Sequence, residues 1–160
     1  MTRAAKPLGA LVTGAASGIG LGIAQYLAER GHAVCLTDLD AAAAAREAQA
    51  LCDRGLLATS QHLDVTSQAS IDAAIAALEP GGPDLLVNNA GLQFVAPLAE
   101  FPREKWELLI AVMLTGSAML TRAALPGMRR RGFGRIVNIG SIHSLVASPY
   151  KSAYVAAKHG

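Results

Sequence analysis

Short apolar runs alternate along the chain with longer segments whose apolar residues recur at helical spacing, and this alternation restricts the fold more than any other feature. Such a pattern favours a doubly wound parallel sheet with helices on both faces. The run Leu85-Leu86-Val87 is wholly apolar, which is typical of a strand covered on both sides. The sequence therefore predicts one α/β domain over residues 1–160. Strands are predicted over residues 9–13, 33–38, 56–63, 85–88 and 135–139, helices over 19–30, 41–54, 67–78 and 103–130, and turns at 31–32, 80–83 and 132–134.

A glycine-rich turn joins the first predicted strand to the first predicted helix. Gly14, Gly18 and Gly20 give the spacing Gly-x-x-x-Gly-x-Gly, which departs from the common Gly-x-Gly-x-x-Gly fingerprint. Glycines here allow a tight turn and let the backbone approach a pyrophosphate, which would rest at the positive end of the following helix. The turn therefore indicates a Rossmann-like dinucleotide site. Glycine-rich turns without a ligand remain the alternative.

Asp38 ends the second predicted strand, twenty-four residues after Gly14. A carboxylate at this place can hold the adenosine ribose hydroxyls, and it would repel a 2′-phosphate. No arginine or lysine stands at positions 15, 16 or 39 to neutralise such a phosphate. Asp38 is therefore predicted to favour NAD over NADP. The alternative is that Asp38 is an N-cap of the next helix, in competition with Asp40.

Ser141, Tyr154 and Lys158 have the spacing that a carbonyl-reduction site requires. Tyr154 and Lys158 are four residues apart and lie on one face of a helix, so the Lys158 ammonium can favour the phenolate form of Tyr154. Such a phenol can give a proton to a ketone oxygen or take one from an alcohol. Ser141 would donate a second hydrogen bond to that oxygen. Read alone, Tyr-x-x-x-Lys is a weak signal.

Together these motifs resemble the short-chain dehydrogenase/reductase family, and the resemblance runs from Leu8 to Gly160. Asp64-Val65 looks like the family's pair flanking the adenine, and Asn88-Asn89-Ala90-Gly91 looks like its strand-four motif. The resemblance implies that Ser141, Tyr154 and Lys158 are catalytic, and that Lys158 also holds the nicotinamide ribose. It implies the following NAD-binding residues: Gly14, Ser17, Gly18, Ile19, Gly20, Asp38, Asp64, Val65, Asn89, Tyr154 and Lys158.

Within the family, the segments 89–102 and 142–158 are most similar to the D-3-hydroxybutyrate dehydrogenase branch. The resemblance implies that Gln93, His143 and Lys151 hold the substrate carboxylate beside Ser141 and Tyr154. An amide, an imidazole and an ammonium that converge in this way suit a small anionic hydroxy or keto acid. The alternative for each of the three is a solvated or hydrogen-bonded loop residue.

Two residues depart from the family pattern. Phe94 stands where the hydroxybutyrate enzymes often carry histidine, which is expected to affect loop packing more than chemistry. Met113 stands where the family usually has an asparagine that organises a water-mediated proton relay. A thioether is a weak acceptor, so the relay is expected to use a backbone carbonyl and water, or another route, or else proton exchange is slower. The apolar residues Trp106, Leu109, Val112 and Met119 of the same predicted helix are expected in the core or in a subunit interface.

Composition excludes several classes of protein. The formal net charge of +2 gives no footprint for nucleic acid or an anionic membrane, and Arg129-Arg130-Arg131 is expected instead to interact with a helix carboxyl end. No apolar run reaches the roughly 18 residues that span a bilayer, and residues 1–7 lack the apolar stretch of a secretion signal. A cytoplasmic protein is expected. Cys35 and Cys52 show no metal or redox spacing, so no metal site and two buried thiols are expected.

The family resemblance further implies a longer protein, with roughly the last third of the domain absent here, and a homotetramer if full length. The leading interpretation is an NAD-dependent D-3-hydroxybutyrate dehydrogenase. The second interpretation is a ketoacyl or acetoacetyl-thioester reductase of the same family. Asp38 and the anion-binding set Gln93, His143 and Lys151 count against it. A non-catalytic dinucleotide-binding fragment is a third, which the intact Ser141, Tyr154 and Lys158 oppose.

Overall fold

The computed structural model describes residues 7–78 and 81–160. The expectations for residues 1–6 and for Pro80 in the predicted turn lie outside this part of the chain. Within it, the predicted α/β architecture is confirmed.

Five parallel strands form the central sheet, in the order β3-β2-β1-β4-β5. From β1, the next two strands of the chain are added on one side of the sheet (β2, then β3), and the last two are added on the other side (β4, then β5). The order of strand addition therefore reverses between β1 and β4. In open parallel sheets, ligands bind at the carboxyl ends of the strands at such a switch point. The strands are β1 (Gly9–Thr13), β2 (Ala33–Asp38), β3 (Ala58–His62), β4 (Leu85–Asn88) and β5 (Arg135–Asn138).

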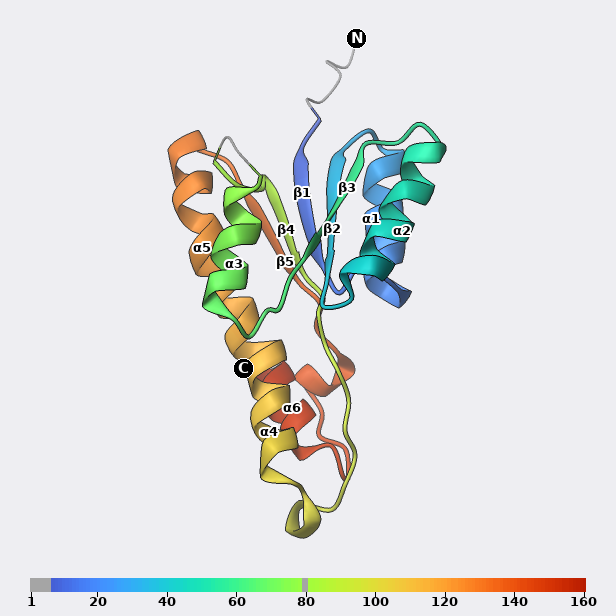
Figure 1. The fold of residues 1–160 in the computed structure, drawn as a ribbon. Coiled ribbons are helices and arrows are strands. Elements are labelled where there is room, and N and C mark those ends of the chain that lie inside the picture. Colours follow the sequence, from blue (N-terminus) through green and yellow to red (C-terminus); the bar gives the residue numbers. More distant parts are fainter. Residues whose placement is uncertain (1–6, 79–80) are drawn as a thin grey trace.

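Helices cover both faces of the sheet (Figure 1), with α1 and α2 on one side and α3 and α5 on the other. Side chains of a strand point alternately to the two faces, and β1 shows this clearly. Ala10 and Val12 pack in the cluster under α1 and α2, whereas Leu11 packs with α3 and α5. These helices are α1 (Gly18–Glu29), α2 (Ala41–Asp53), α3 (Gln68–Ala76) and α5 (Gly116–Arg131).

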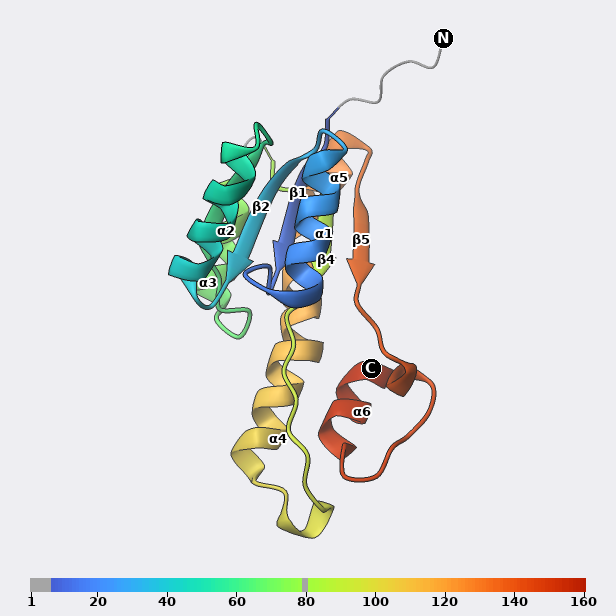
Figure 2. The same cartoon turned by 90° about the vertical axis from the view of Figure 1, so that its right-hand side faces the viewer.

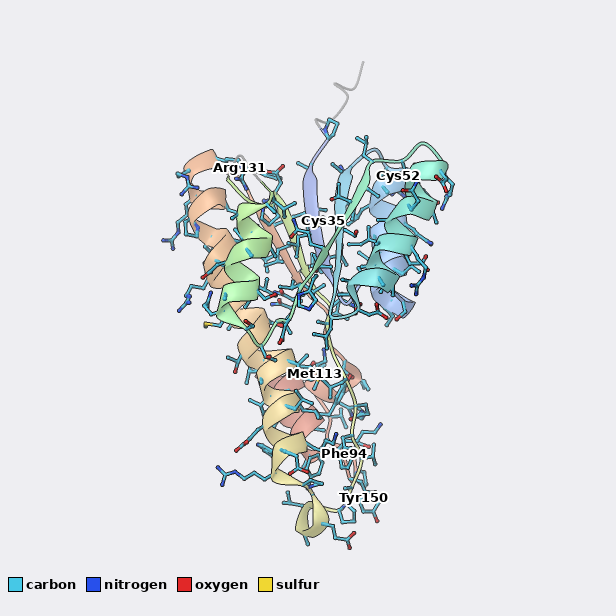
Figure 3. The ribbon with its side chains drawn as sticks, viewed as in Figure 1. Cys35, Cys52, Phe94, Met113, Arg131 and Tyr150 are labelled. Carbon is cyan, nitrogen blue, oxygen red and sulfur yellow. The ribbon has the colours of Figure 1, made fainter. Side chains whose placement is uncertain are left out.

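A smaller lobe extends beyond the carboxyl edge of the sheet (Figure 2) and contains α4 (Arg103–Ile110) and α6 (Ser152–His159). Its core joins Leu109 and Met113 to Ala153 and Ala157, all buried. Phe94, Phe101 and Trp106 pack edge to face around it, with ring centroids 5.3 and 5.9 Å apart. Phe94 and Tyr150 lie toward the far end of the lobe and Met113 nearer the sheet (Figure 3). Leu109 is buried in this core and Trp106 packs against it, which agrees with the core alternative of the sequence expectation, given there as core or subunit interface.

Several predicted bounds differ from the structure by one or two residues, and two predicted elements differ for reasons that the structure shows. The strand predicted from residue 56 begins at Ala58, because Leu56 N–H still bonds Leu51 O at the end of α2. The helix predicted over 103–130 is divided into α4, a π-helix at Ala111–Thr115, and α5. A π-bulge within a helix frequently marks a functional site, and this one contains Met113.

Two further sequence expectations concern side chains labelled in Figure 3. Cys35 is buried, and desolvation raises the pKa of its thiol, but Cys52 is exposed, so the prediction that both thiols are buried is wrong for Cys52. Cys52 lies near the end of α2, where its Sγ donates to Ala58 O at the start of β3 at 3.2 Å. The basic run does lie in the last turn of α5, and Arg131 also pairs with Asp84 at 3.0 Å. Arg131 therefore joins the end of α5 to the sheet.

One helical stretch, Arg103–Arg131, is long and apolar enough to cross a membrane by length and composition alone. This differs from the sequence expectation that no segment qualifies. The finding is weak evidence, since the core helix of a soluble protein meets the same criterion. Here the stretch contributes Leu109, Met113, Leu120 and Ala124 to two of the hydrophobic cores.

Candidate active site at the carboxyl edge of the sheet

A cavity of about 720 Å³ opens at the switch point between β1 and β4. It extends from the glycine turn past β2 and β3 to the start of the lobe, so it has the elongated path that a dinucleotide needs. Most of the sequence-predicted site residues line it: Gly14, Ser17, Gly18, Ile19, Asp38, Asp64, Val65, Asn89, Gln93, Tyr154 and Lys158. The other four, Gly20, Ser141, His143 and Lys151, are not part of this lining.

The glycine turn owes its shape to positions where a side chain is excluded. Gly14 and Gly18 have φ values of 61° and 55°, in the left-handed region that glycine tolerates best. Gly20 is buried at the start of α1, and a methyl group there would collide with Gly14 O and lie 2.5 Å from Asn89 Nδ2. The turn thus leaves Ser17, Gly18 and Ile19 exposed at the amino end of α1. This cradle of backbone fits a pyrophosphate.

Asn89 and Thr13 hold this turn against β4. The Asn89 amide donates to Thr13 O at 2.9 Å and Gly14 O at 3.1 Å. In return the Thr13 hydroxyl oxygen accepts from Asn89 N and Ala90 N at 3.0 and 2.9 Å. The side chain of Asn89 therefore shapes the glycine turn, and Asn89 also lines the cavity. The sequence analysis did not predict that Thr13 supports the turn. The signal that could have suggested it is the position of a threonine immediately before a glycine turn.

Asp38 is a carboxylate at the mouth of the cavity rather than a helix cap. The N-cap of α2 is Asp40, whose carboxylate accepts from Ala43 N at 2.9 Å. Asp38 instead accepts from Ala16 N and Asp40 N, both at 3.1 Å, which joins the glycine turn to β2. The capping alternative for Asp38 is therefore excluded, and its carboxylate is held beside the turn.

Asp64 and Val65 follow β3, next to the end of β2, where Leu63 N donates to Asp38 O at 2.9 Å. Hydrogen bonds from the hydroxyl and backbone N–H of Thr66, at 2.6 and 2.8 Å, lower the pKa of Asp64. Asp64 thus remains ionised beside the cavity over the physiological range. Val65 is 8% exposed and packs closely on Gly116 of α5. A flat apolar surface beside an acceptor suits an adenine ring.

Ser141 follows β5, and Tyr154 and Lys158 lie on α6. The Ser141 oxygen accepts from His143 N at 3.2 Å, which leaves its hydroxyl hydrogen free to be donated elsewhere. Lys158 Nζ donates to Ile139 O at 2.6 Å and lies 5.9 Å from the Tyr154 ring centroid. The fold thereby gathers the ends of β5 and α6 around Tyr154. No sequence signal could mark Ile139, because its backbone carbonyl makes the contact.

The predicted substrate residues occur on two loops that the fold brings together. Gln93 lies in the loop after β4, whereas His143 and Lys151 lie between β5 and α6. Ala96 N donates to Tyr150 O at 3.0 Å, which joins the loops. His143 packs edge to face on Tyr154 with centroids 6.0 Å apart, and Lys151 Nζ is 3.3 Å from His143 Nε2. Across the described ranges, no three His, Cys, Asp or Glu side chains form a group able to hold a metal.

Met113 lies in the π-helix, between the cavity and the core of the lobe. Its side chain is 6% exposed and lies where Gly91 approaches the helix. Its backbone oxygen accepts from the Ser117 hydroxyl at 2.9 Å. The Met113 carbonyl, which the sequence analysis considered for the proton relay, thus already accepts a hydrogen bond from Ser117. The Ser117 hydroxyl can itself exchange a proton.

Comparison with known proteins identifies the family. The family model described as short chain dehydrogenase matches residues 9–160, nearly the whole chain. The chain belongs to the short-chain dehydrogenase/reductase family. It is 47% identical over 153 residues to a D-beta-hydroxybutyrate dehydrogenase of Cupriavidus necator and 45% identical over 155 residues to one of Rhizobium meliloti. Each of these alignments covers 94% of the chain.

A solved structure of this family supports the fold assignment. A gluconate 5-dehydrogenase from Burkholderia cenocepacia, in complex with NADP and tartrate, aligns with a TM-score of 0.89 at 39% identity. The alignment covers 94% of the chain and 60% of the gluconate 5-dehydrogenase. The chain likewise spans 59% and 60% of the two hydroxybutyrate dehydrogenases. The short-chain dehydrogenase fold is thus present here over about three fifths of its length in these relatives.

Proposed function

We propose that the full-length protein is an NAD-dependent oxidoreductase that interconverts D-3-hydroxybutyrate and acetoacetate. The observation that carries this proposal is the contact of Lys151 with His143, whose ring packs on Tyr154. An ammonium at this place can hold the substrate carboxylate while the hydroxyl on C3 reaches the phenol. The similarity to two D-beta-hydroxybutyrate dehydrogenases supports the same substrate.

The cofactor residues divide into three groups. Gly14, Ser17, Gly18, Ile19 and Gly20 would hold the pyrophosphate at the start of α1, where backbone N–H groups and the helix dipole favour an anion. Asp38 would accept from the adenosine ribose hydroxyls, and Asp64 with Val65 would flank the adenine. Asn89 and Lys158 would border the nicotinamide end. NAD supplies the acceptor of a hydride from C3 of the substrate.

The proton chemistry rests on the chain's own side chains. Tyr154 takes the hydroxyl proton of the substrate during oxidation and returns it during reduction. Ser141 donates its free hydroxyl hydrogen to the same oxygen. Lys158, whose Nζ lies 5.9 Å from the Tyr154 ring centroid, would hold the nicotinamide ribose. The Ser117 hydroxyl on Met113 O offers a polar group for proton exchange near the residue that replaces the family's asparagine.

The partly exposed helical stretch Arg103–Arg131 bears on assembly. In its most apolar window 28% of the residues are buried, and Leu108 of the stretch is a large apolar side chain that is exposed. We assign the exposed part of this stretch to contacts between subunits in a homotetramer of the full-length protein, and we propose that this protein is cytoplasmic. The net charge of +2 supports a small anionic substrate as the partner, rather than nucleic acid or a membrane.

The substrate assignment is tested by steady-state kinetics of the full-length protein. We expect NAD-dependent oxidation of D-3-hydroxybutyrate, with kcat/KM at least about 100-fold higher than for 2-butanol, because a charge-assisted hydrogen bond forms only with the acid. Gluconate and a 3-hydroxyacyl thioester serve as competing substrates. A clear preference for either of them would replace the hydroxybutyrate assignment.

Gluconate is the second candidate substrate, since the NADP-bound structural relative is a gluconate 5-dehydrogenase. A polyhydroxy acid also carries a carboxylate that Lys151 could bind. Activity with no substrate of these classes would favour a non-catalytic dinucleotide-binding protein.

Asp38→Ala tests the choice of cofactor. The unmodified full-length protein is expected to bind NADH much more tightly than NADPH, because the Asp38 carboxylate would repel a 2′-phosphate. The substitution should lower the ratio of NADH affinity to NADPH affinity by about 10-fold or more, because it removes both the ribose contact and the repulsion of the 2′-phosphate. Fluorescence titration with each cofactor measures the two affinities. Asp40→Ala is the control, because Asp40 caps α2 and the ratio should not change. Equal affinities in the unmodified protein would contradict the NAD assignment.

A further inference from the structure

The Lys158 ammonium is anchored by a backbone carbonyl in the segment that follows β5. Its Nζ donates to Ile139 O at 2.6 Å. Both residues line the candidate cofactor cavity and also a second cavity, of about 450 Å³. An ammonium has three hydrogens to donate, so this contact engages one of them and directs the other two. The orientation of Lys158 therefore depends on where Ile139 O is held.

Ile139 lies just beyond the regular part of the sheet. β5 ends at Asn138, and the next N–H, that of Ile139, donates to Asn88 O at 2.9 Å. The Ile139 carbonyl accepts from Lys158. The position of this carbonyl is thus set by how firmly the end of β5 is fixed on β4.

Two asparagine side chains fix that end. Asn88 and Asn138 are register partners on β4 and β5, and Asn88 Nδ2 donates to Asn138 Oδ1 at 2.8 Å. The same nitrogen lies 3.3 Å from Thr121 Oγ1 and 3.4 Å from Ser117 O on α5. A carbonyl such as Ser117 O only accepts, which requires the amide nitrogen of Asn88 on this side. The asparagine pair thereby joins the end of β5 to both β4 and α5.

Packing alone does not explain why this register pair is polar. The pair before it, Val87 with Val137, is apolar. Asn88 is 5% exposed, and its Oδ1 is buried without a hydrogen-bond partner among the described residues. A buried unpaired acceptor lowers stability, and two apolar residues would avoid that cost. The amides supply instead a directed bond that apolar side chains cannot form.

We infer that Asn138 is a positioning residue, which through its bond to Asn88 holds Ile139 O in place and so orients Lys158. The inference rests on the proposed function, in which Lys158 holds the nicotinamide ribose. Asn138 is not part of the lining of the cofactor cavity, so it acts through the backbone of the next residue. A long side chain that is held in advance loses less freedom when it binds a ligand, which strengthens NADH binding.

NADH titration of full-length variants tests the inference. Asn138→Ala should weaken NADH binding by about 3- to 10-fold, because the cofactor itself must then order Lys158. Asn138→Asp should stay within about twofold of the unmodified protein, since a carboxylate oxygen can accept the same hydrogen from Asn88. Fluorescence titration measures the affinities, and urea unfolding checks that each variant is folded. Asn138→Leu, whose side chain is closer in volume, should repeat the loss and replaces Asn138→Ala if that variant does not fold.

Thr121→Val is the matched control for Asn138→Ala. It also removes an acceptor of Asn88 Nδ2, but on α5, and it leaves the bond to Asn138 in place. NADH affinity and kcat should both stay within about twofold. A loss as large as that of Asn138→Ala would show that any contact of Asn88 supports the site, and it would overturn the inference.

A double-mutant cycle decides whether the effect passes through Lys158. In the Lys158→Ala background, Asn138→Ala should weaken NADH binding by less than about twofold further. Losses that multiply would show that Asn138 acts independently of Lys158 and would overturn the inference, as would unchanged NADH affinity in Asn138→Ala alone.

These titrations use no substrate, so they separate the inference from the substrate assignment. If the unmodified protein binds NADH but does not oxidise D-3-hydroxybutyrate, the substrate assignment fails while the cycle still reports the role of Asn138. If the unmodified protein does not bind NADH, the proposed function and the inference both fail.

Discussion

Tyr154→Phe in the full-length protein is expected to lower kcat by about 100- to 10,000-fold while NADH affinity stays within about twofold. The ring and its edge-to-face contact with His143 are retained, but the hydroxyl that exchanges the proton is lost. Stopped-flow or steady-state kinetics measure turnover, and NADH fluorescence measures binding. A substitution that removes only a transition-state interaction should alter kcat far more than cofactor affinity.

Tyr150→Phe is the matched control for Tyr154→Phe. Tyr150 lies four residues earlier, is 59% exposed, and contributes its backbone oxygen to the contact with Ala96. Loss of its phenol should leave kcat within about twofold. Lys158→Ala gives the complementary pattern, since it should weaken NADH binding as well as turnover. If Tyr154→Phe retained most of the activity, Tyr154 would have no role as the proton donor.

Gly20→Ala is expected to destabilise the domain by about 3 kcal/mol, because overpacking a rigid site costs on that order. It should also weaken NADH binding by more than about 10-fold, because a disturbed turn no longer presents its backbone to the pyrophosphate. The added methyl group would collide with Gly14 O and lie 2.9 Å from Gly14 C, so the turn itself must move. Urea unfolding gives the change in stability, and fluorescence titration gives the change in affinity.

Gly22→Ala, two residues along the same helix, is the control for Gly20→Ala. A methyl group at Gly22 meets no heavy atom within 4 Å. Replacing an open helical glycine by alanine should raise stability by about 0.5–1 kcal/mol, since it reduces the backbone entropy of the unfolded chain. NADH affinity should be unchanged. Similar stability and affinity for both variants would show that close packing at Gly20 does not maintain the turn.

Several features of this protein follow from local sequence alone. The strands β1, β2 and β4 begin and end at the predicted residues, because short apolar runs bounded by turn residues have few alternatives. The place of the cofactor turn was also predictable, since Gly14 and Gly18 adopt the left-handed conformation that glycine permits. Asp38 was placed correctly at the end of a strand. These properties depend on neighbours within a few positions.

Other features depended on contacts between distant parts of the chain. The π-helix at Ala111–Thr115 could not be predicted, because the periodicity on both sides of it is helical. The exposure of Cys52 was misjudged, since an apolar helix pattern does not reveal which face the sheet covers. The choice between Asp38 and Asp40 as helix cap required the fold, because both have the right chemistry and only geometry separates them.

The sequence by itself determined the alternation of strands and helices, the position of the glycine turn, and the types of side chain available for proton transfer and anion binding. Only the tertiary structure decided how those side chains divide the work. Asn89 donates to Thr13 O and Gly14 O, and His143 Nε2 lies 3.3 Å from Lys151 Nζ. The reason is physical: a residue type fixes which hydrogen bonds are possible, whereas the partners brought close by packing decide which of them form.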